Sequence, residues 1–153
     1  MTLNQKETAL LQDLKSHEQL CVDKYEKYFY YALDGQLKAL FSKIGVAEQQ
    51  HLDTINQILD GTVPQMENSS DNQQKMPVQA NYSPDCIEVN KIKDKYLCSD
   101  VLATEKHVSS VYDTSIFEFR DENIRNVLNH IQKEEQEHGA QIFNYMSQNG
   151  MYE

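Results

Sequence analysis

Two stretches decide the fold of this chain, KIGVAEQQHLDTI at residues 43–55 and HIQKEEQEHGAQI at residues 130–142. In both, an isoleucine, a glutamate, a histidine and a second isoleucine follow one another at steps of four, three and four residues. Side chains at this spacing lie on one face of an α-helix, and an apolar face of this kind packs against neighbouring elements. Each stretch therefore predicts a helix that carries a glutamate and a histidine toward the protein interior.

The two stretches belong to a longer internal repeat with an offset of 87 residues. The same offset brings Glu18 onto Glu105 and Tyr25 onto Tyr112. Similarity of one part of a chain to another at a fixed offset is typical of a duplicated structural unit. We therefore interpret the chain as two copies of one helical hairpin.

Length and composition predict a single all-α domain over residues 1–153. The chain is long enough to bury one core, and its five glycines, three prolines and absence of tryptophan argue against a turn-rich β fold. Apolar residues at helical steps predict one hairpin over 3–60 and a second over 85–149, which begins at Ser83-Pro84-Asp85. The stretch 61–84 is rich in Asn, Gln, Ser and Pro and has no helical period, so it predicts a long crossover. This connectivity is that of a four-helix bundle.

Charge and cysteine content exclude several classes of protein. The formal net charge of −10 argues against electrostatic binding of nucleic acid or of anionic lipid. Three cysteines without CxxC spacing argue against a disulfide framework and against a thiolate zinc site. The chain has no apolar run of about 18 residues and a polar start, so we expect a soluble protein made in the cytoplasm, without a membrane partner.

The spacing within each hairpin places four glutamates at one level. Glu18 and Glu48 lie 30 residues apart, and so do Glu105 and Glu135. The turns between them are expected at Asp34-Gly35 and at Asp121-Glu122-Asn123. Residues equidistant from the turn of an antiparallel hairpin lie at the same height, here about 22 Å from the turn at 1.5 Å per residue. All four carboxylates are therefore expected in one layer of the bundle.

This layer is a candidate dinuclear metal centre. A solvated helix face is the simpler interpretation of any single glutamate, but it does not explain six positions on four apolar faces at one height. Buried carboxylates cannot all stay charged without cations, and two metal ions would remove that cost. One Glu from each of two helices and Glu-x-x-His from each of the other two is the ligand set of carboxylate-bridged dinuclear proteins. Oxygen and imidazole ligands suit iron or manganese, with zinc as a substitute. The predicted ligands are Glu18, Glu48, His51, Glu105, Glu135 and His138.

Two tyrosines lie beside the predicted ligands. Tyr25 and Tyr112 come seven residues after Glu18 and Glu105, two turns along the same face. A core aromatic is the favoured interpretation, and a residue that hydrogen-bonds a ligand or relays electrons is the alternative that makes both tyrosines candidate catalytic residues. Cys21 is interpreted as a small buried hydrophobe, with a redox role as its alternative.

The ligand spacing resembles that of the ferritin-like superfamily, which includes rubrerythrins, bacterioferritins and manganese catalases. The resemblance covers both hairpins and implies that Glu48 and Glu135 bridge two metal ions. It implies that His51 and His138 each hold one ion, while Glu18 and Glu105 are terminal or mobile ligands. The scattered cysteines depart from the rubredoxin centre of a standard rubrerythrin, and no fifth helix of the ferritin cage type is expected.

The second half of the chain is similar to the spore coat protein F family of endospore-forming Firmicutes. The segments that carry the similarity are Leu102-Ala103-Thr104-Glu105-Lys106, Ser110-Val111-Tyr112, Glu134-Glu135 and Gly150-Met151-Tyr152. Met151 stands where the family usually has an aromatic residue. The resemblance implies association with the spore coat or expression during sporulation, for a protein made in the mother-cell cytoplasm that could be deposited in the coat with other coat proteins as partners.

Three functions follow as hypotheses. The first is a coat-associated protein that folds around a di-iron or di-manganese site. The second is an oxidoreductase that uses this site to consume oxygen or peroxide. Iron storage in a cage is the least favoured. The oligomeric state is left open between a monomer and a homodimer, because the aromatic cluster over 25–31 suits either a subunit contact or packing on neighbouring helices.

Overall fold

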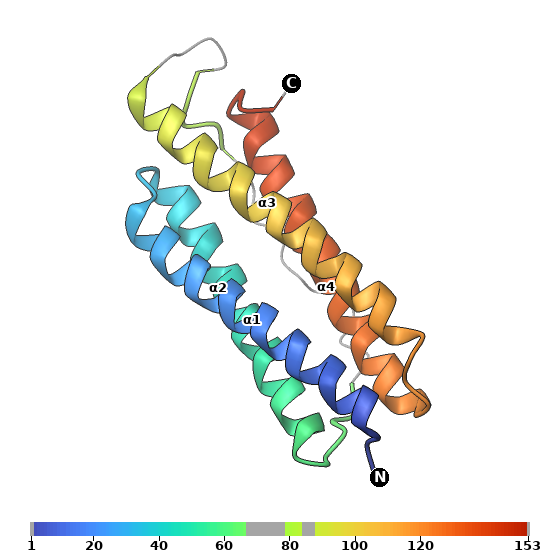
Figure 1. Ribbon diagram of the computed structural model, residues 1–153. Helices are drawn as coiled ribbons and strands as arrows, with labels where there is room; N and C mark the ends of the chain where they lie inside the picture. The colour runs from blue at the N-terminus through green and yellow to red at the C-terminus, as the bar shows by residue number, and fades with distance from the viewer. Residues whose placement is uncertain (1, 67–78, 84–87, 153) are drawn as a thin grey trace.

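Four helices form the protein in a computed structural model that describes residues 2–66, 79–83 and 88–152. They are α1 (Gln5–Tyr31), α2 (Gly35–Leu59), α3 (Val89–Ile116) and α4 (Glu122–Gln148), as Figure 1 shows. These described ranges contain no strand. The predicted all-α class is therefore confirmed.

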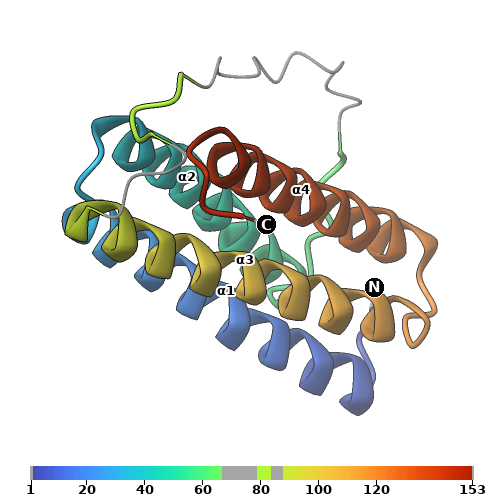
Figure 2. The same ribbon diagram turned by 90° about the horizontal axis from the view of Figure 1, so that it is seen from above.

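The helices pair as two antiparallel hairpins that lie side by side. α1 packs along α2 and α3 packs along α4, and contacts of α1 with α3 and of α2 with α4 join the hairpins (Figure 1). Viewed from above, α1 and α3 form one layer and α2 and α4 form the other (Figure 2). The end of α2 and the start of α3 lie at opposite ends of the bundle (Figure 1).

Each predicted turn overlaps the observed connection only at its aspartate, and the second connection begins well before the predicted residues. Asp34 is the N-cap of α2, but α3 already ends at Ile116. Asp121 is the N-cap of α4, and its carboxylate accepts the backbone N–H groups of Asn123 and Ile124. An aspartate is favoured at this position because it satisfies N–H groups that the first helical turn leaves unpaired. The three residues predicted as a turn therefore start the helix.

Parts of the predicted crossover, residues 67–78, and of the predicted start of the second hairpin, including Pro84 and Asp85, lie outside the described residues. Helix α3 is described from Val89. The described crossover ends pack against the bundle, with Val63 and Met66 at one apolar cluster and Tyr82 at the other.

Asp94 on α3 anchors the turn between α1 and α2. It is fully buried, and its two carboxylate oxygens accept the backbone N–H groups of Leu33 and Asp34, each at 2.9 Å. It also accepts the Tyr82 hydroxyl at 2.8 Å. A buried carboxylate is tolerated where hydrogen bonds satisfy it. This residue therefore links the first hairpin and the crossover to the second hairpin.

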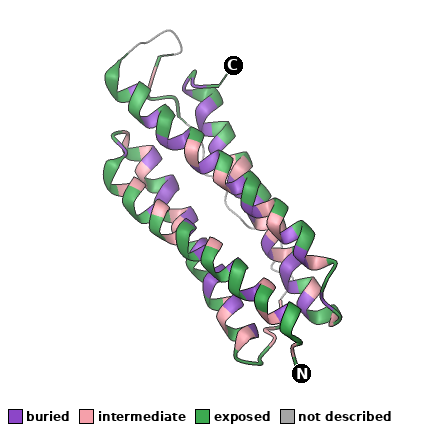
Figure 3. Ribbon diagram, in the orientation of Figure 1, coloured by how far each residue is buried: buried purple, intermediate pink, exposed green. Residues whose placement is uncertain are grey.

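The buried side chains form two apolar clusters, one toward each end of the bundle. One contains Phe41, Ile44 and Leu97, and the other contains Leu14 and Leu128. Buried positions follow the inward faces of all four helices (Figure 3). The predicted ligands are buried on these same faces but belong to neither apolar cluster.

Glu7 is a buried acid at the opposite end from Asp94. Its side chain forms a capping box with Asn4 and accepts three hydrogen bonds from Arg120, one from the backbone N–H and two from the guanidinium, all at 3.1 Å. The hydrogen bond with the Arg120 side chain, against the opposing effect of burial, lowers the pKa of Glu7 to about 2. The ionised form of Glu7 therefore ties the start of α1 to the α3–α4 turn.

Glu7→Gln is expected to lower the free energy of unfolding by about 1–3 kcal/mol at neutral pH. Because the folded-state pKa lies below the unfolded value of 4.5, this stabilisation is complete above the unfolded pKa. It is lost as the pH falls toward the folded value, so the difference between the two proteins should shrink between about pH 5 and pH 2. Urea unfolding of both proteins across this range measures it. The exposed Lys6–Glu118 pair supplies the control, because Glu118→Gln should change stability by less than about 1 kcal/mol. A Glu7→Gln effect that stays constant with pH would contradict the assignment.

Candidate metal centre

The structure brings all six predicted ligands together in one buried layer. α1 contributes one glutamate and α3 another, while α2 and α4 each contribute a glutamate and a histidine one turn apart. None of these side chains is more than 4% exposed. The six residues are Glu18, Glu48, His51, Glu105, Glu135 and His138.

The six side chains form two overlapping groups, each able to surround one ion. The first group is Glu18, Glu48, His51 and Glu135, and the second is Glu48, Glu105, Glu135 and His138. Within each group, one potential ligand atom of every residue lies within 4.8 Å of those of the others. Glu48 and Glu135 belong to both groups and could hold two ions at once.

The two histidines approach the carboxylates through the same ring nitrogen. His51 Nδ1 lies 3.0 Å from Glu135 Oε1 and 3.3 Å from Glu48 Oε2. His138 Nδ1 lies 3.0 Å from Glu48 Oε1 and 3.6 Å from Glu105 Oε1. The rings lie with their centroids 5.8 Å apart and an interplanar angle of 23°. Each histidine therefore lies next to one glutamate of its own hairpin and one glutamate of the opposite hairpin.

The glutamates of α1 and α3 favour the protonated form in the absence of a cation. Burial, followed by the charges of Glu48 and Glu135, raises the pKa of Glu18 well above its usual range. Burial and the contact with Glu135 raise the pKa of Glu105 in the same way. Like charges held together in a dry layer disfavour ionisation.

The other two glutamates stay ionised because the histidines face them. Burial opposes ionisation, but contacts with His138 and His51 hold the pKa of Glu48 well below its usual range. Contacts with Glu105, His138 and His51, again against burial, lower the pKa of Glu135. The same carboxylates, together with Glu134 beside His51 and Glu105 beside His138, raise the pKa of both histidines against the effect of burial. Without a cation the layer thus holds protons that a metal ion would have to displace.

Three carboxylate oxygens in this layer lack a hydrogen-bond partner among the described residues. They are Oε2 of Glu18, Oε2 of Glu105 and Oε2 of Glu135, and all three are buried. A buried polar atom without a partner costs on the order of 1–3 kcal/mol, more when it is charged. Unpartnered oxygens on three of the predicted ligands are what a site built for cations leaves when none is present, so the donor set fits metal ions.

The two tyrosines donate to ligand carboxylates across the hairpins. Tyr25 on α1 donates to Oε1 of Glu105 on α3 at 2.6 Å, and Tyr112 on α3 donates to Oε1 of Glu18 on α1 at 2.5 Å. Burial and the neighbouring carboxylates raise the pKa of both hydroxyls well above the usual range, so both remain donors. Both tyrosines are fully buried, and each therefore combines core packing with orientation of a predicted ligand.

One buried cysteine and three further histidines complete the set of cysteines and histidines considered for the site. Cys21 is fully buried, and burial raises its thiol pKa, as expected of a small hydrophobe. Three further histidines are at least partly exposed, namely His17, His107 and His130. Of these, His130 is relevant to the site because its Nε2 lies 2.9 Å from Glu134 Oε1.

Glu134, which the sequence places only in the Glu134-Glu135 segment of the family similarity, lies beside a candidate ligand. Its Oε1 lies 3.3 Å from His51 Nε2, the ring nitrogen that faces away from the other carboxylates. A carboxylate at the outer nitrogen of a histidine fixes the orientation and tautomer of the ring. The repeat places Ala47 at the equivalent position beside the other half of the layer. This departure from the repeat is the signal in the sequence that could have identified Glu134.

Comparison with known proteins gives one match. Residues 93–153 match the family model of the Coat F domain. The matched segment is less than half of the chain and contains Glu105, Glu135 and His138, whereas the other three predicted ligands lie outside it. No curated protein and no solved structure matches the chain. None of the described helices is both long and apolar enough to span a bilayer.

Tyr25→Phe and Tyr112→Phe are each expected to destabilise the metal-free protein by about 1–3 kcal/mol. Each removes a donor to a buried carboxylate while keeping the ring that fills the core. Urea unfolding in the presence of a chelator measures the loss. Tyr30→Phe is the matched control on α1, because Tyr30 is 70% exposed and its hydroxyl loss should change stability by less than about 0.5 kcal/mol. Wild-type stability in both buried variants would contradict the role assigned to these hydroxyls.

Proposed function

We propose that this protein is a ferritin-like, di-metal-binding protein associated with the spore coat, with two iron or manganese ions held between its four helices. The observation that carries the proposal is the pair of overlapping buried groups, each of three carboxylates and one histidine, that share Glu48 and Glu135. Two carboxylates shared between two ions are the bridge of a carboxylate dinuclear centre.

The burial and the charge of this layer favour bound cations over a layer of polar residues that only supports the fold. Four carboxylates lie within one dry layer between two apolar clusters, and three of their oxygens are unpartnered. Protonation of Glu18 and Glu105 relieves the repulsion, but it holds protons on two carboxyl groups that are ordinarily ionised at neutral pH. Two divalent ions would balance four carboxylates and provide partners for these oxygens. The mixed oxygen and nitrogen donors favour iron or manganese, with zinc as a substitute.

Each ligand has a role in this proposal. Glu48 and Glu135 bridge, His51 and Glu18 complete one half, and His138 and Glu105 complete the other half. Tyr25 and Tyr112 orient the two non-bridging carboxylates, because each donates to one oxygen and leaves the second oxygen free for an ion. Bound iron or manganese would supply Lewis-acid and one-electron redox chemistry to this layer.

The spore-coat part of the proposal rests on the Coat F domain match over 93–153. The segment supplies α4 and most of α3, and it therefore holds half of the ligand set. The first hairpin supplies the other half. In this proposal the protein is made in the mother cell, folds around its metal ions, and joins other coat proteins in the coat.

A second candidate function is an oxidoreductase that consumes oxygen or peroxide at the same centre. The observation that favours it is the contact of a buried tyrosine hydroxyl with a ligand carboxylate in each half of the layer. A phenol at this distance could exchange a proton or an electron with the centre. Tyr25 and Tyr112 are the candidate catalytic residues of this alternative.

Metal stoichiometry tests the centre directly. Protein stripped with a chelator and titrated anaerobically with Fe(II) or Mn(II) should bind two ions per chain, measured by calorimetry and by elemental analysis after desalting. Glu48→Gln combined with Glu135→Gln should abolish binding of both ions, because each ion loses both bridging ligands. Glu137→Gln is the matched control on α4, since it lies outside both groups, and it should retain two ions. Two ions per chain in the double variant would contradict the assigned ligands.

Oxygen consumption separates the two candidate functions. Fe(II)-loaded protein exposed to air should take up oxygen faster than the Glu48→Gln, Glu135→Gln protein if the centre is catalytic, and transient visible absorption should accompany the uptake. Tyr25→Phe and Tyr112→Phe should change the decay of that absorption while leaving two ions bound. Equal oxygen uptake by the wild type and the double variant would exclude the oxidoreductase and leave a structural metal centre.

A further inference from the structure

A pocket between α3 and α4 reaches the predicted ligands from the protein surface. Its volume is about 440 Å³. Its walls include Leu102, Glu105, Ser109, Glu135, Gly139 and Phe143. Glu105 and Glu135 are ligands of the half-site that contains His138, and both carry an unpartnered carboxylate oxygen. The pocket therefore opens on this half-site.

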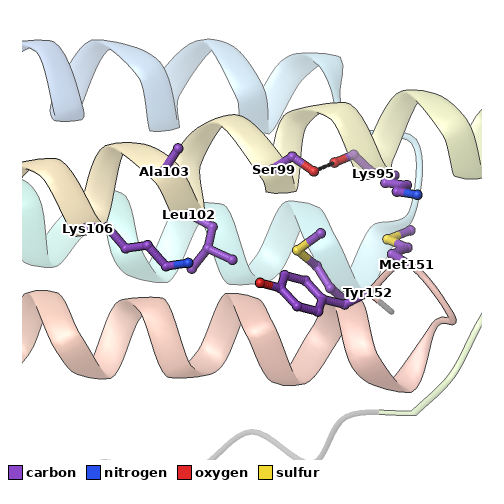
Figure 4. A pocket seen from close by; sticks show the side chains of 8 residues that line it. Lys95, Ser99, Leu102, Ala103, Lys106, Met151 and Tyr152 are labelled. Atoms are coloured by element: carbon purple, nitrogen blue, oxygen red, sulfur yellow. Dashed lines mark hydrogen bonds between the residues drawn. The ribbon is translucent and has the colours of Figure 1, made fainter.

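A neighbouring pocket of about 500 Å³ extends the groove along α3 toward the C-terminal residues (Figure 4). Leu102 and Lys106 line both pockets, and Lys95 and Tyr152 line the outer one. In Figure 4 the side chains of Leu102 and Lys106 extend from α3 toward α4, on the same side as Tyr152. Two lysines thus lie along this groove in a protein whose net charge is −10.

The repeat shows that the pocket is a departure from the symmetry of the two hairpins. The offset of 87 residues places Leu52 at the position of Gly139 and Val22 at that of Ser109. Leu52 is buried, at 5% exposure. The first hairpin therefore has larger side chains at the positions where the second hairpin has a pocket.

Backbone geometry does not require a glycine at position 139. The positive-φ glycines of the described chain are Gly61 and Gly150, and Gly139 lies inside the regular helix α4. A Cβ built on Gly139 would meet Leu102 Cδ1 at 3.7 Å, which is an ordinary contact. Glycine in a helix interior costs about 1 kcal/mol relative to alanine. The lack of a side chain at Gly139 therefore serves to leave space in the pocket, and the backbone conformation does not require it.

The other half-site has a different neighbour on its outer side. The outer nitrogen of His51 lies against Glu134, which also contacts His130. A carboxylate at this position would repel an approaching anion. The lysine-lined groove and the space at Gly139 are on the His138 side.

We propose that the α3–α4 pocket binds a small monoanion that reaches the half-site of Glu105, Glu135 and His138, and that Gly139 keeps this pocket open. This inference rests on the proposed metal centre. Two divalent ions would balance the four carboxylates of the layer, so that a monoanion meets no net repulsion there. Lys106 at the outer part of the pocket attracts anions. Four donor residues in each group leave positions that an added ligand could take on an ion that prefers six.

Azide binding to the Co(II)-loaded protein tests the inference, with the visible absorption of Co(II) as the readout. Gly139→Leu, which introduces the residue of the first hairpin, should weaken azide binding at least tenfold while two Co(II) ions per chain remain bound. Gly139→Ala and Ser109→Val should give smaller losses, because each fills part of the pocket. Lys106→Gln should slow azide binding several-fold at low salt and reduce its dependence on salt.

Ala39→Leu is the control, because it adds a leucine at an exposed position of α2 and should leave azide binding unchanged. Circular dichroism verifies the fold of each variant, and Gly139→Ala with Ser109→Val carries the test if Gly139→Leu does not fold. Wild-type azide affinity in the folded pocket variants would overturn the inference, and so would a wild type that holds two Co(II) ions but binds no azide. A wild type that fails to bind two Co(II) ions would overturn the proposed metal centre itself, which distinguishes the two failures.

Discussion

The rest of the structure depends on one constraint, the burial of four carboxylates and two imidazoles in a single layer of a helical bundle. Transfer of a charged group from water to a dry interior is strongly unfavourable unless an opposite charge accompanies it. All six groups are at least 96% buried. The apolar clusters on either side must supply the stability that this layer does not, and the turns must keep its members at one height. Asp94 at one end and Glu7 at the other perform that second task through hydrogen bonds between the hairpins.

The duplicated hairpin explains how such a layer is built from few elements. Each copy contributes a tyrosine, a glutamate and a Glu-x-x-His pair, and the two tyrosines donate to the glutamates of the opposite copy. The copies differ where one of them gains a new contact or loses a side chain. Glu134, which contacts His51, stands where the first copy has Ala47. Gly139, which lines the pocket at the other half-site, stands where the first copy has Leu52. The chain thus keeps the symmetry of the ligands and departs from it in their surroundings.

Much of the fold, and the meeting of the six candidate ligands in one buried layer, could be predicted because these features depend on local periodicity and on the repeat. The four-three-four steps around Glu48 and Glu135 identify helix faces without knowledge of neighbours. The second turn was predicted too far along the chain because an aspartate such as Asp121 is favoured both in turns and at helix N-caps. The end of α3 at Ile116 shows that the connection comes before Asp121. The contacts of the buried acids Glu7 and Asp94 and of the half-buried Glu134 were not identified, since their partners lie 113, 61 and 83 residues away along the chain.

The sequence by itself determined the all-helical class, the duplicated hairpin and the set of candidate ligand residues, because helical spacing and the offset of 87 residues can be seen in the sequence of a single chain. Only the tertiary structure decided which hydroxyls donate to these carboxylates and on which side of the layer a pocket opens. These features arise where side chains of different helices meet, and the packing of one helix against another sets the distances there.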